Sequence, residues 1–207
     1  MRKLKITEMN RLTEEEFKVS RKMTLKVVLD DVRSMHNVGA VFRTADAFRI
    51  ESIYICGITA TPFEREEENG RPQGSPLHNK VNEHKLHSHQ EIHKTALGAE
   101  FTVDWKHFES VIEAVEELHE EGYKVYAIEQ CEGSVMLDKL KIDSNGKYAI
   151  ILGNEVKGVS QEAIDKCDGS IEIPQYGTKH SLNVSVAAGI AMWELIKALK
   201  AVDKYGE

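Results

Sequence analysis

Residues 25–48 read LKVVLDDVRSMHNVGAVFRTADAF, and the fold prediction depends on this stretch. The run over residues 25–29 is short, apolar and rich in valine, which indicates a buried strand. After a polar loop over 30–37, apolar residues at helical spacing predict a helix over 38–48. A strand followed by a loop and a helix is the repeating unit of α/β proteins with a parallel sheet.

The same alternation continues along the chain. We expect further strands over residues 52–56, 124–128, 147–152 and 170–173, and helices over 111–118, 161–166 and 182–199. The sequence therefore predicts an α/β fold with a mainly parallel sheet and helices on both faces. Ligands of such sheets bind in the loops at the carboxyl ends of the strands.

The composition is that of an ordinary globular protein. The chain has 207 residues, of which 41% are hydrophobic and 29% are charged, so we expect a single domain. No apolar stretch approaches the ~18 residues of a spanning helix, and the N-terminus does not resemble a secretory signal. The three cysteines, Cys56, Cys131 and Cys167, form no CxxC pair. Sparse free thiols are typical of a reducing compartment, which predicts a cytoplasmic protein.

Charge is distributed unevenly. The net charge is -7, which argues against a general nucleic-acid binder, but residues 1–26 hold eight Lys or Arg and four Glu. Thr13 followed by Glu16 fits a capping box at the start of a short helix ending near residue 22. We divide the chain into a basic helical N-terminal arm over 1–25 and a main domain over 26–207. The arm could contact phosphates, or it could be a solvated amphipathic helix without a partner.

A polar segment interrupts the alternation. Residues 62–90 contain three of the four prolines, which predicts a long mobile surface loop, with an insertion near 64–90. Four histidines lie close together in and after this segment: His84, His87, His89 and His93. No cysteine is near them and their spacing matches no closed zinc site, so we expect no bound metal.

The first loop of interest lies between the opening strand and helix. Asn37 could cap the helix, and Gly39 permits close approach of another backbone. Arg43 comes one and a half turns later, near the apolar side of the helix. A guanidinium there needs a partner such as a phosphate or a carboxylate. An ion pair with Asp46 is the structural alternative.

Two later loops also follow predicted strands. IILGNEVKGV over 150–159 ends a buried strand with Gly153 and continues with polar residues and a second glycine. It lacks the glycine patterns of triphosphate and dinucleotide sites. IEIPQYGTKHSLNVSVAAG over 171–189 stops a strand at Pro174, and Ser181 or Asn183 can cap the last helix. Each loop alone could be only a tight turn or a cap.

In combination and in this order, the three loops resemble one family. NxGxxxRTA over 37–45, LGNExxG over 152–158 and IP…SLNVSxA over 173–187 are similar to the motifs of the SpoU (TrmH-like) branch of the SPOUT methyltransferases. The resemblance covers roughly residues 27–195. It implies a C-terminal trefoil knot, which is otherwise nearly absent among folds. It also implies a homodimer with the active site near the interface. The first half of the last helix is apolar nearly all round, which suits a dimer or a monomer core.

The resemblance also implies a chemistry and its residues. S-adenosylmethionine would lie in the knotted loops against the backbone of Ile128, Glu129, Gly153, Ile173 and Leu182. Arg43 would be catalytic, helped by a set that positions it, the ribose and the cofactor: Asn37, Glu155, Ser181 and Asn183. Because an arginine stays protonated, we expect Arg43 to bind a substrate phosphate and stabilise the developing alkoxide, while a phosphate oxygen or water takes the proton. No metal is required.

The function implied is methylation of a ribose 2′-hydroxyl in RNA. About 25 residues precede the first strand, which favours tRNA over rRNA as the partner. One alternative is a base methylase of the same fold, although the NxGxxxRTA motif goes with ribose chemistry. A second alternative is a non-catalytic RNA-binding protein.

Overall fold

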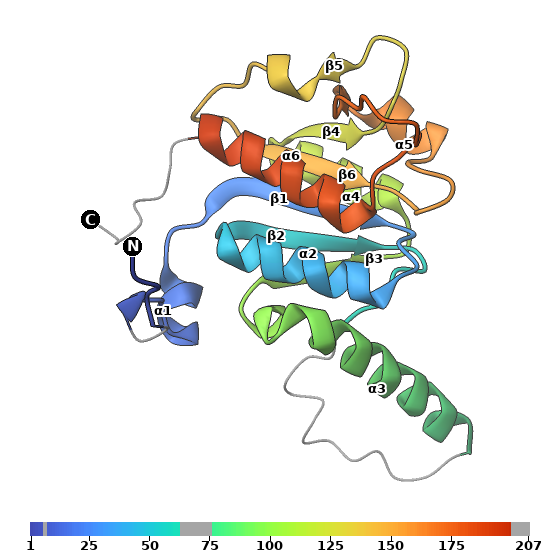
Figure 1. Cartoon of the computed structure of the whole chain (residues 1–207). Coiled ribbons are helices and arrows are strands. Elements are labelled where there is room, and N and C mark those ends of the chain that lie inside the picture. The colour runs from blue at the N-terminus through green and yellow to red at the C-terminus, as the bar shows by residue number, and fades with distance from the viewer. Residues whose placement is uncertain (6–7, 63–75, 200–207) are drawn as a thin grey trace.

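The structure is a computed structural model that describes residues 1–5, 8–62 and 76–199, with only the backbone for 76–85. Its described strands form one sheet in the order β3-β2-β1-β6-β4-β7-β5, and neighbouring strands pair in parallel (Figure 1). The strands are β1 (Met23–Asp30), β2 (Ile50–Cys56), β3 (Asp104–Phe108), β4 (Lys124–Ile128), β5 (Val135–Met136), β6 (Tyr148–Leu152) and β7 (Gly169–Glu172). The predicted parallel α/β sheet is confirmed.

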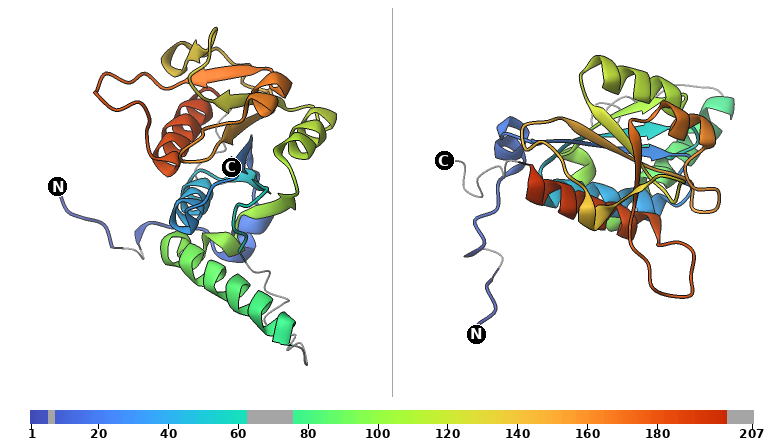
Figure 2. Two further views of the ribbon diagram at one scale, coloured as in Figure 1. Left: turned by 90° about the vertical axis from the view of Figure 1, so that its right-hand side faces the viewer. Right: turned by 90° about the horizontal axis from the view of Figure 1, so that it is seen from above.

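Helices cover both faces of the sheet (Figures 1 and 2). Val27 and Leu29 of β1 belong to the core shared with α2 (Met35–Ala47), α3 (Pro76–Ala96) and α6 (Val184–Ala198). Val28 faces the opposite way, into the core shared with α4 (Val111–Glu120) and α5 (Gln161–Lys166). Successive strand residues point to opposite faces, so a continuous apolar run such as 27–29 requires cover on both sides.

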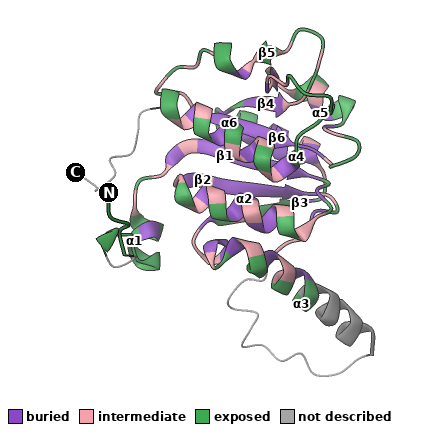
Figure 3. Cartoon of the chain, in the orientation of Figure 1, coloured by how far each residue is buried: buried purple, intermediate pink, exposed green. Residues whose placement is uncertain are grey.

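The strand register aligns the carboxyl ends of the central strands. Leu29 of β1 lies beside Leu152 of β6, and Ala127 of β4 lies beside Ile151. The strands β1, β2 and β6 are buried, whereas the outward faces of the helices and the loops are exposed (Figure 3). The loops that follow β1, β4, β6 and β7 therefore emerge together at one edge of the sheet.

The N-terminal arm contains the expected capping box. The Thr13 side chain accepts from the Glu16 backbone N–H at 3.2 Å, and the Glu16 carboxylate accepts from the Thr13 N–H at 2.8 Å. Helix α1 (Glu14–Val19) is shorter than predicted, and Phe17 is buried against the main core. Strand β1 begins at Met23, inside the range predicted for the arm.

The prediction of a loop over 62–90 is wrong from Pro76 onward, because the backbone there forms helix α3. Proline is tolerated in the first turn of a helix, so Pro76 starts this helix rather than breaking it. The contact that holds α3 comes from Ile92 and Ala96, which are buried in the core with α2. Because α3 has few such apolar positions, its sequence shows only a weak helical periodicity, and the helix was not predicted. Residues 63–75 of the predicted loop lie outside the described residues.

Other differences are local. The helix predicted over 38–48 begins at Met35, because Ser34 caps it by accepting from the Asn37 N–H at 3.3 Å. Strands β3 and β5 were not predicted, since β3 is largely exposed and β5 has two residues. Two short 3-10 helices, η3 (Ala99–Phe101) and η4 (Leu137–Lys139), complete the described elements. Within the described residues, no helix has the length and apolar character needed to cross a bilayer.

Candidate active site at the carboxyl edge of the sheet

A groove of about 860 Å³ lies at the carboxyl ends of β4, β6 and β7. Apolar residues such as Leu152 and Ile171, near the ends of β6 and β7, form part of its lining. Every residue that we predicted to bind the cofactor lines this groove: Ile128, Glu129, Gly153, Ile173 and Leu182. The structure thus brings these residues, which lie at or just after the ends of β4, β6 and β7 and in the loop before α6, to one cavity.

The loop after β6 is unusually tight. Asn154 and Gly158 exchange two backbone hydrogen bonds, of 3.1 and 2.8 Å, which close the loop on itself. A Cβ on Gly153 would lie 2.2 Å from the carbonyl carbon of Gly158, so no larger residue fits at that position. Gly158 has a φ of +69°, a conformation that glycine adopts without cost. Gly153 and Gly158 therefore allow the loop after β6 to close tightly, and this loop forms one wall of the groove.

Glu129 supports this wall from the neighbouring strand. Its Oε2 accepts from the Val159 N–H at 3.1 Å, and its Oε1 accepts from the Gln130 N–H at 2.9 Å. A Cβ at Gly158 would meet the same carboxylate at 2.1 Å. We expected only the backbone near Glu129 to matter, but its carboxylate also ties the end of β4 to the loop after β6.

Three of the predicted catalytic residues form a chain across the mouth of the groove. Asn183 donates from Nδ2 to Oδ1 of Asn37 at 3.1 Å, and Asn37 donates from Nδ2 to Oε1 of Glu155 at 3.0 Å. Asn183 also caps α6 by accepting from the N–H groups of Ser185 and Val186. Each motif contributes one member, so the chain fixes the starts of α2 and α6 relative to the loop after β6.

Glu155 is the anchor of this chain. Its two oxygens accept from the backbone N–H groups of Arg33 and Ser34, each at 3.0 Å, in addition to Asn37. Partial burial raises the pKa of Glu155, but these hydrogen bonds outweigh it and hold the pKa below its ordinary value. A charged carboxylate beside the first turn of α2 also suits the helix dipole. Asn37 was predicted to cap α2, but Ser34 does so, which leaves the Asn37 amide free to bridge.

Arg43 and Ser181 stand apart from the chain. Arg43 lies on the exposed side of α2, and among the described residues its side chain has no hydrogen-bond or ionic partner. The alternative ion pair with Asp46 is not formed, because Asp46 accepts from the Thr102 hydroxyl at 2.5 Å. Ser181 is exposed on the rim of the groove and does not cap α6. Both side chains are available to a ligand.

The lining of the groove is acidic. It contains one lysine, Lys157, and five carboxylates: Glu129, Glu132, Glu155, Asp165 and Glu172. A phosphate inside this groove would be repelled, whereas a ligand carrying positive charge would be attracted. The apolar residues of the lining, Leu152 and Ile171 among them, can contact a flat ring. The cavity therefore fits a cationic molecule with an aromatic part, such as S-adenosylmethionine.

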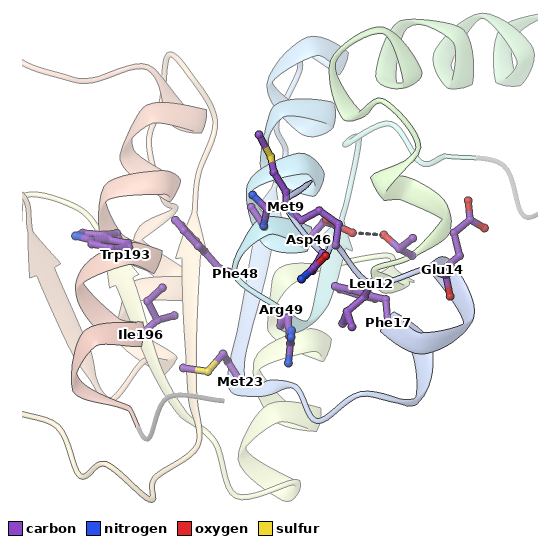
Figure 4. A pocket seen from close by; sticks show the side chains of 15 residues that line it. Met9, Leu12, Glu14, Phe17, Met23, Asp46, Phe48, Arg49, Trp193 and Ile196 are labelled. Carbon is purple, nitrogen blue, oxygen red and sulfur yellow. Dashed lines mark hydrogen bonds between the residues drawn. The ribbon is translucent and has the colours of Figure 1, made fainter. Parts of the chain in front are cut away.

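A second groove, of about 500 Å³, lies at the other end of α2 between the arm and α6 (Figure 4). Apolar side chains line much of it, including Phe17, Phe48 and Trp193. No residue predicted for catalysis or cofactor binding lines this groove. Its position, away from the carboxyl edge of the sheet, makes it a poor candidate for the active site.

The histidines of α3 do not gather into a metal site in the described part of the chain. His93 pairs with Glu100, and His36 of α2 pairs with Glu91 at 3.0 Å. Among the side chains that the structure describes, which do not include that of His84, no group of three or more is placed to bind a metal ion.

Asn154 is a site residue that we did not single out. It donates from Nδ2 to the carbonyl oxygen of Asp31 at 2.8 Å and accepts from the N–H groups of Val156 and Lys157. The available signal was its place between a strand-ending glycine and Glu155. Asparagine there commonly organises a turn through its own side chain.

Comparisons with known proteins identify the family of the chain. The chain matches the SpoU rRNA Methylase family over residues 77–193, more than half of its length. It is 32% identical over 191 residues to the tRNA (guanosine(18)-2'-O)-methyltransferase of Thermus thermophilus, covering 91% of this chain and 82% of that protein. It is 30% identical over 184 residues to the Bacillus subtilis 23S rRNA (guanosine(2553)-2'-O)-methyltransferase RlmP, covering 89% and 61%.

Solved structures show the same relationship. The TrmH/SpoU tRNA modifying enzyme of A. aeolicus superimposes with a TM-score of 0.65 at 25% identity, covering 89% of this chain and 79% of that one. The AdoMet-bound rRNA methyltransferase of Sinorhizobium meliloti shares the fold, with a TM-score of 0.64 at 23% identity over 89% and 60% of the two chains. The resemblance inferred from the three motifs is confirmed, and the chain belongs to the SpoU methylase family.

Proposed function

We propose that this protein transfers a methyl group from S-adenosylmethionine to a ribose 2′-hydroxyl of an RNA. The observation that carries the proposal is the chain Glu155–Asn37–Asn183, which joins the three motifs beside an acidic groove that Glu155 lines. The 2′-O-methyltransferase names of the two relatives support the same reaction. We favour tRNA, because the chain is 32% identical to the tRNA enzyme over 191 residues and 30% identical to the rRNA enzyme over 184 residues.

Cofactor binding is assigned to the five predicted groove residues. Their backbone groups, on the ends of β4 and β7 and the loops after β6 and β7, would hold the adenosine and methionine parts. When bound there, S-adenosylmethionine supplies the methyl group. No residue of the groove needs a metal for this reaction.

Arg43 is assigned the catalytic role. A guanidinium remains protonated, so it binds a phosphate and stabilises the alkoxide that develops on the ribose, while a phosphate oxygen or water takes the proton. Its lack of a partner among the described residues supports this assignment. Ser181, exposed on the rim, would contact the ribose or cofactor.

A homodimer would complete this site. Arg43 lies six residues beyond Asn37, about 9 Å along the α2 axis, and points outward rather than into its own groove. Beside it, α6 exposes an apolar stripe of Val186, Ile190 and Trp193. We propose that two copies pack through this face, which would bury the stripe and place Arg43 at the interface.

We also propose a knotted chain, a role for the N-terminal arm and a cellular location. A trefoil knot is consistent with β6 lying between β1 and β4, and with the Gln130 side chain donating to the His180 carbonyl at 2.7 Å across two loops. We also propose that the basic arm over 1–25 contributes phosphate contacts. The free cysteines support a cytoplasmic location.

The test is transfer of labelled methyl from S-adenosylmethionine to unmodified tRNA and, separately, to rRNA, followed by nucleoside analysis. We expect a 2′-O-methyl nucleoside from the tRNA. A methylated base instead would identify a base methylase. RNA binding without transfer, with cofactor binding verified, would indicate a non-catalytic protein.

Substitution of Arg43 tests the mechanism. We expect Arg43→Ala to lower turnover by about 10²-fold or more, with cofactor affinity near that of the wild type. Arg43→Lys keeps the positive charge but lacks the planar guanidinium with its paired N–H donors. Its turnover should therefore lie between those of Arg43→Ala and the wild type. Turnover of Arg43→Ala within twofold of wild type would exclude the proposed role.

A further inference from the structure

Among the described residues, two exposed cations beside the groove, Arg33 and Lys157, lack the carboxylate partners that several other cations of the body have. Lys26, Lys106 and Lys197, for example, each pair with a carboxylate. Arg33 and Lys157 are exposed, and their side chains make no hydrogen bond or ion pair within the described part of the chain. They come from the loops after β1 and β6, 124 positions apart in sequence.

The loops that carry these two cations are joined rigidly. The Arg33 N–H donates to Oε2 of Glu155 at 3.0 Å, and the Lys157 N–H donates to Oδ1 of Asn154 at 3.1 Å. The same Asn154 side chain donates to the Asp31 carbonyl at 2.8 Å. The backbones of Arg33 and Lys157 are therefore held in one hydrogen-bonded corner. Lys157 lines the groove, and Arg33 is bonded through its N–H to Glu155, which also lines it.

The carboxylates of this corner are engaged by other groups. Glu155 accepts from two backbone amides and from Asn37, and Asp31 accepts from the Ile58 N–H at 3.0 Å. Neither carboxylate pairs with Arg33 or Lys157. The corner therefore presents two positive charges at the lip of a groove whose interior is acidic.

We infer that Arg33 and Lys157 bind phosphates of the RNA strand that flank the target ribose. This inference rests on the proposed function. A ribose presented to the groove brings its neighbouring phosphates to the lip, where the acidic interior would repel them. Two unpaired cations there would offset that repulsion and hold the strand, while adding no base preference because phosphate contacts carry no direct sequence information.

The test uses the RNA that the wild-type protein methylates. Its dissociation constant is measured between 50 and 200 mM salt for the wild type, Arg33→Ala, Lys157→Ala and the double variant. The matched control is Lys141→Ala, because Lys141 is also exposed and without a partner in the described residues. It lies at the opposite, amino edge, near the Asp143 N–H that donates to the Tyr148 hydroxyl at 2.8 Å.

Each lost phosphate contact should lower the slope of log affinity against log salt by about 0.7 to 0.9. Over this fourfold salt range, the salt-induced loss of affinity should then shrink by about threefold for each single variant and about tenfold for the double. The slope of the Lys141→Ala control should match that of the wild type.

The outcomes separate this inference from the proposed function. If the wild type methylates RNA but both variants keep its salt slope, the phosphate assignment is overturned and the reaction stands. If Lys157→Ala weakens S-adenosylmethionine binding without changing the RNA slope, its assignment to phosphate is overturned. If the wild type transfers no methyl group to any RNA, the proposed function fails and this inference fails with it.

Discussion

Gly39 allows a direct test of how α3 is attached to the body. It lies in α2, and a Cβ added there would be 2.2 Å from the Ile92 carbonyl oxygen, 2.2 Å from the Thr95 hydroxyl and 3.0 Å from the Ala96 nitrogen. The Thr95 side chain could rotate, but the backbone of α3 cannot yield locally. Gly39→Ala must therefore separate the two helices.

Two opposing effects set the size of the change. Alanine favours a helix interior over glycine by about 1 kcal/mol. Overpacking costs about 1 to 3 kcal/mol, and occasionally more. A 2.2 Å approach to a backbone atom places this position at the upper end, so we expect a net loss near 2 kcal/mol. For a chain of this size, that loss corresponds to a fall in Tm of about 4 to 8 °C.

Gly189 of α6 is the matched control. A Cβ there would meet only the Thr44 methyl, at 3.9 Å, which is an ordinary contact. Gly189→Ala should keep the gain in helix propensity and raise Tm by about 2 to 4 °C. Both variants are compared by thermal and urea unfolding. If Gly39→Ala is as stable as the wild type, a Cβ at this position does not force α2 and α3 apart. If Gly189→Ala is less stable than the wild type, the expected gain from the helix propensity of alanine is wrong.

Three further changes test other parts of the structure. The lowered pKa of Glu155 means that its carboxylate stabilises the fold above an unfolded value of about 4.3 and loses that effect as pH falls through the folded pKa. Tm measured from pH 7 to pH 3 should therefore fall less steeply in Glu155→Gln than in the wild type. Burial, followed by the charge of Asp31, raises the pKa of Asp30 to about 6. The raised pKa lowers the free energy of unfolding progressively between about pH 4 and pH 6, where the buried carboxyl of the folded protein resists ionisation. Asp30→Asn should therefore raise the free energy of unfolding at pH 7 by up to about 3 kcal/mol, as measured by urea unfolding. An unchanged free energy at pH 7 would contradict this prediction. Trp193→Asp should convert the proposed dimer to monomers in sedimentation experiments, and an intact dimer would place the interface elsewhere.

Several elements could be predicted because their signals are local. The β4 and α5 ranges match the prediction, since β4 is a short apolar run after Gly122 and α5 begins directly after its capping residue Ser160. The capping box of Thr13 and Glu16 needs only residues three positions apart. Helix α3 and strand β3 could not be predicted in this way. Their stability comes from one buried face on α2 and from the sheet edge offered by β2.

The sequence by itself determined the parallel α/β sheet, the family and the residues around the groove. The apolar periodicities that predict strands and helices are found among neighbouring residues. The tight loop after β6 requires its two motif glycines. Only the tertiary structure decided what the polar motif residues do. Glu155, Asn37 and Asn183 meet across separations of 118 and 146 residues. A hydrogen bond over such a distance depends on how the strands are ordered in the sheet, and no local pattern encodes that order.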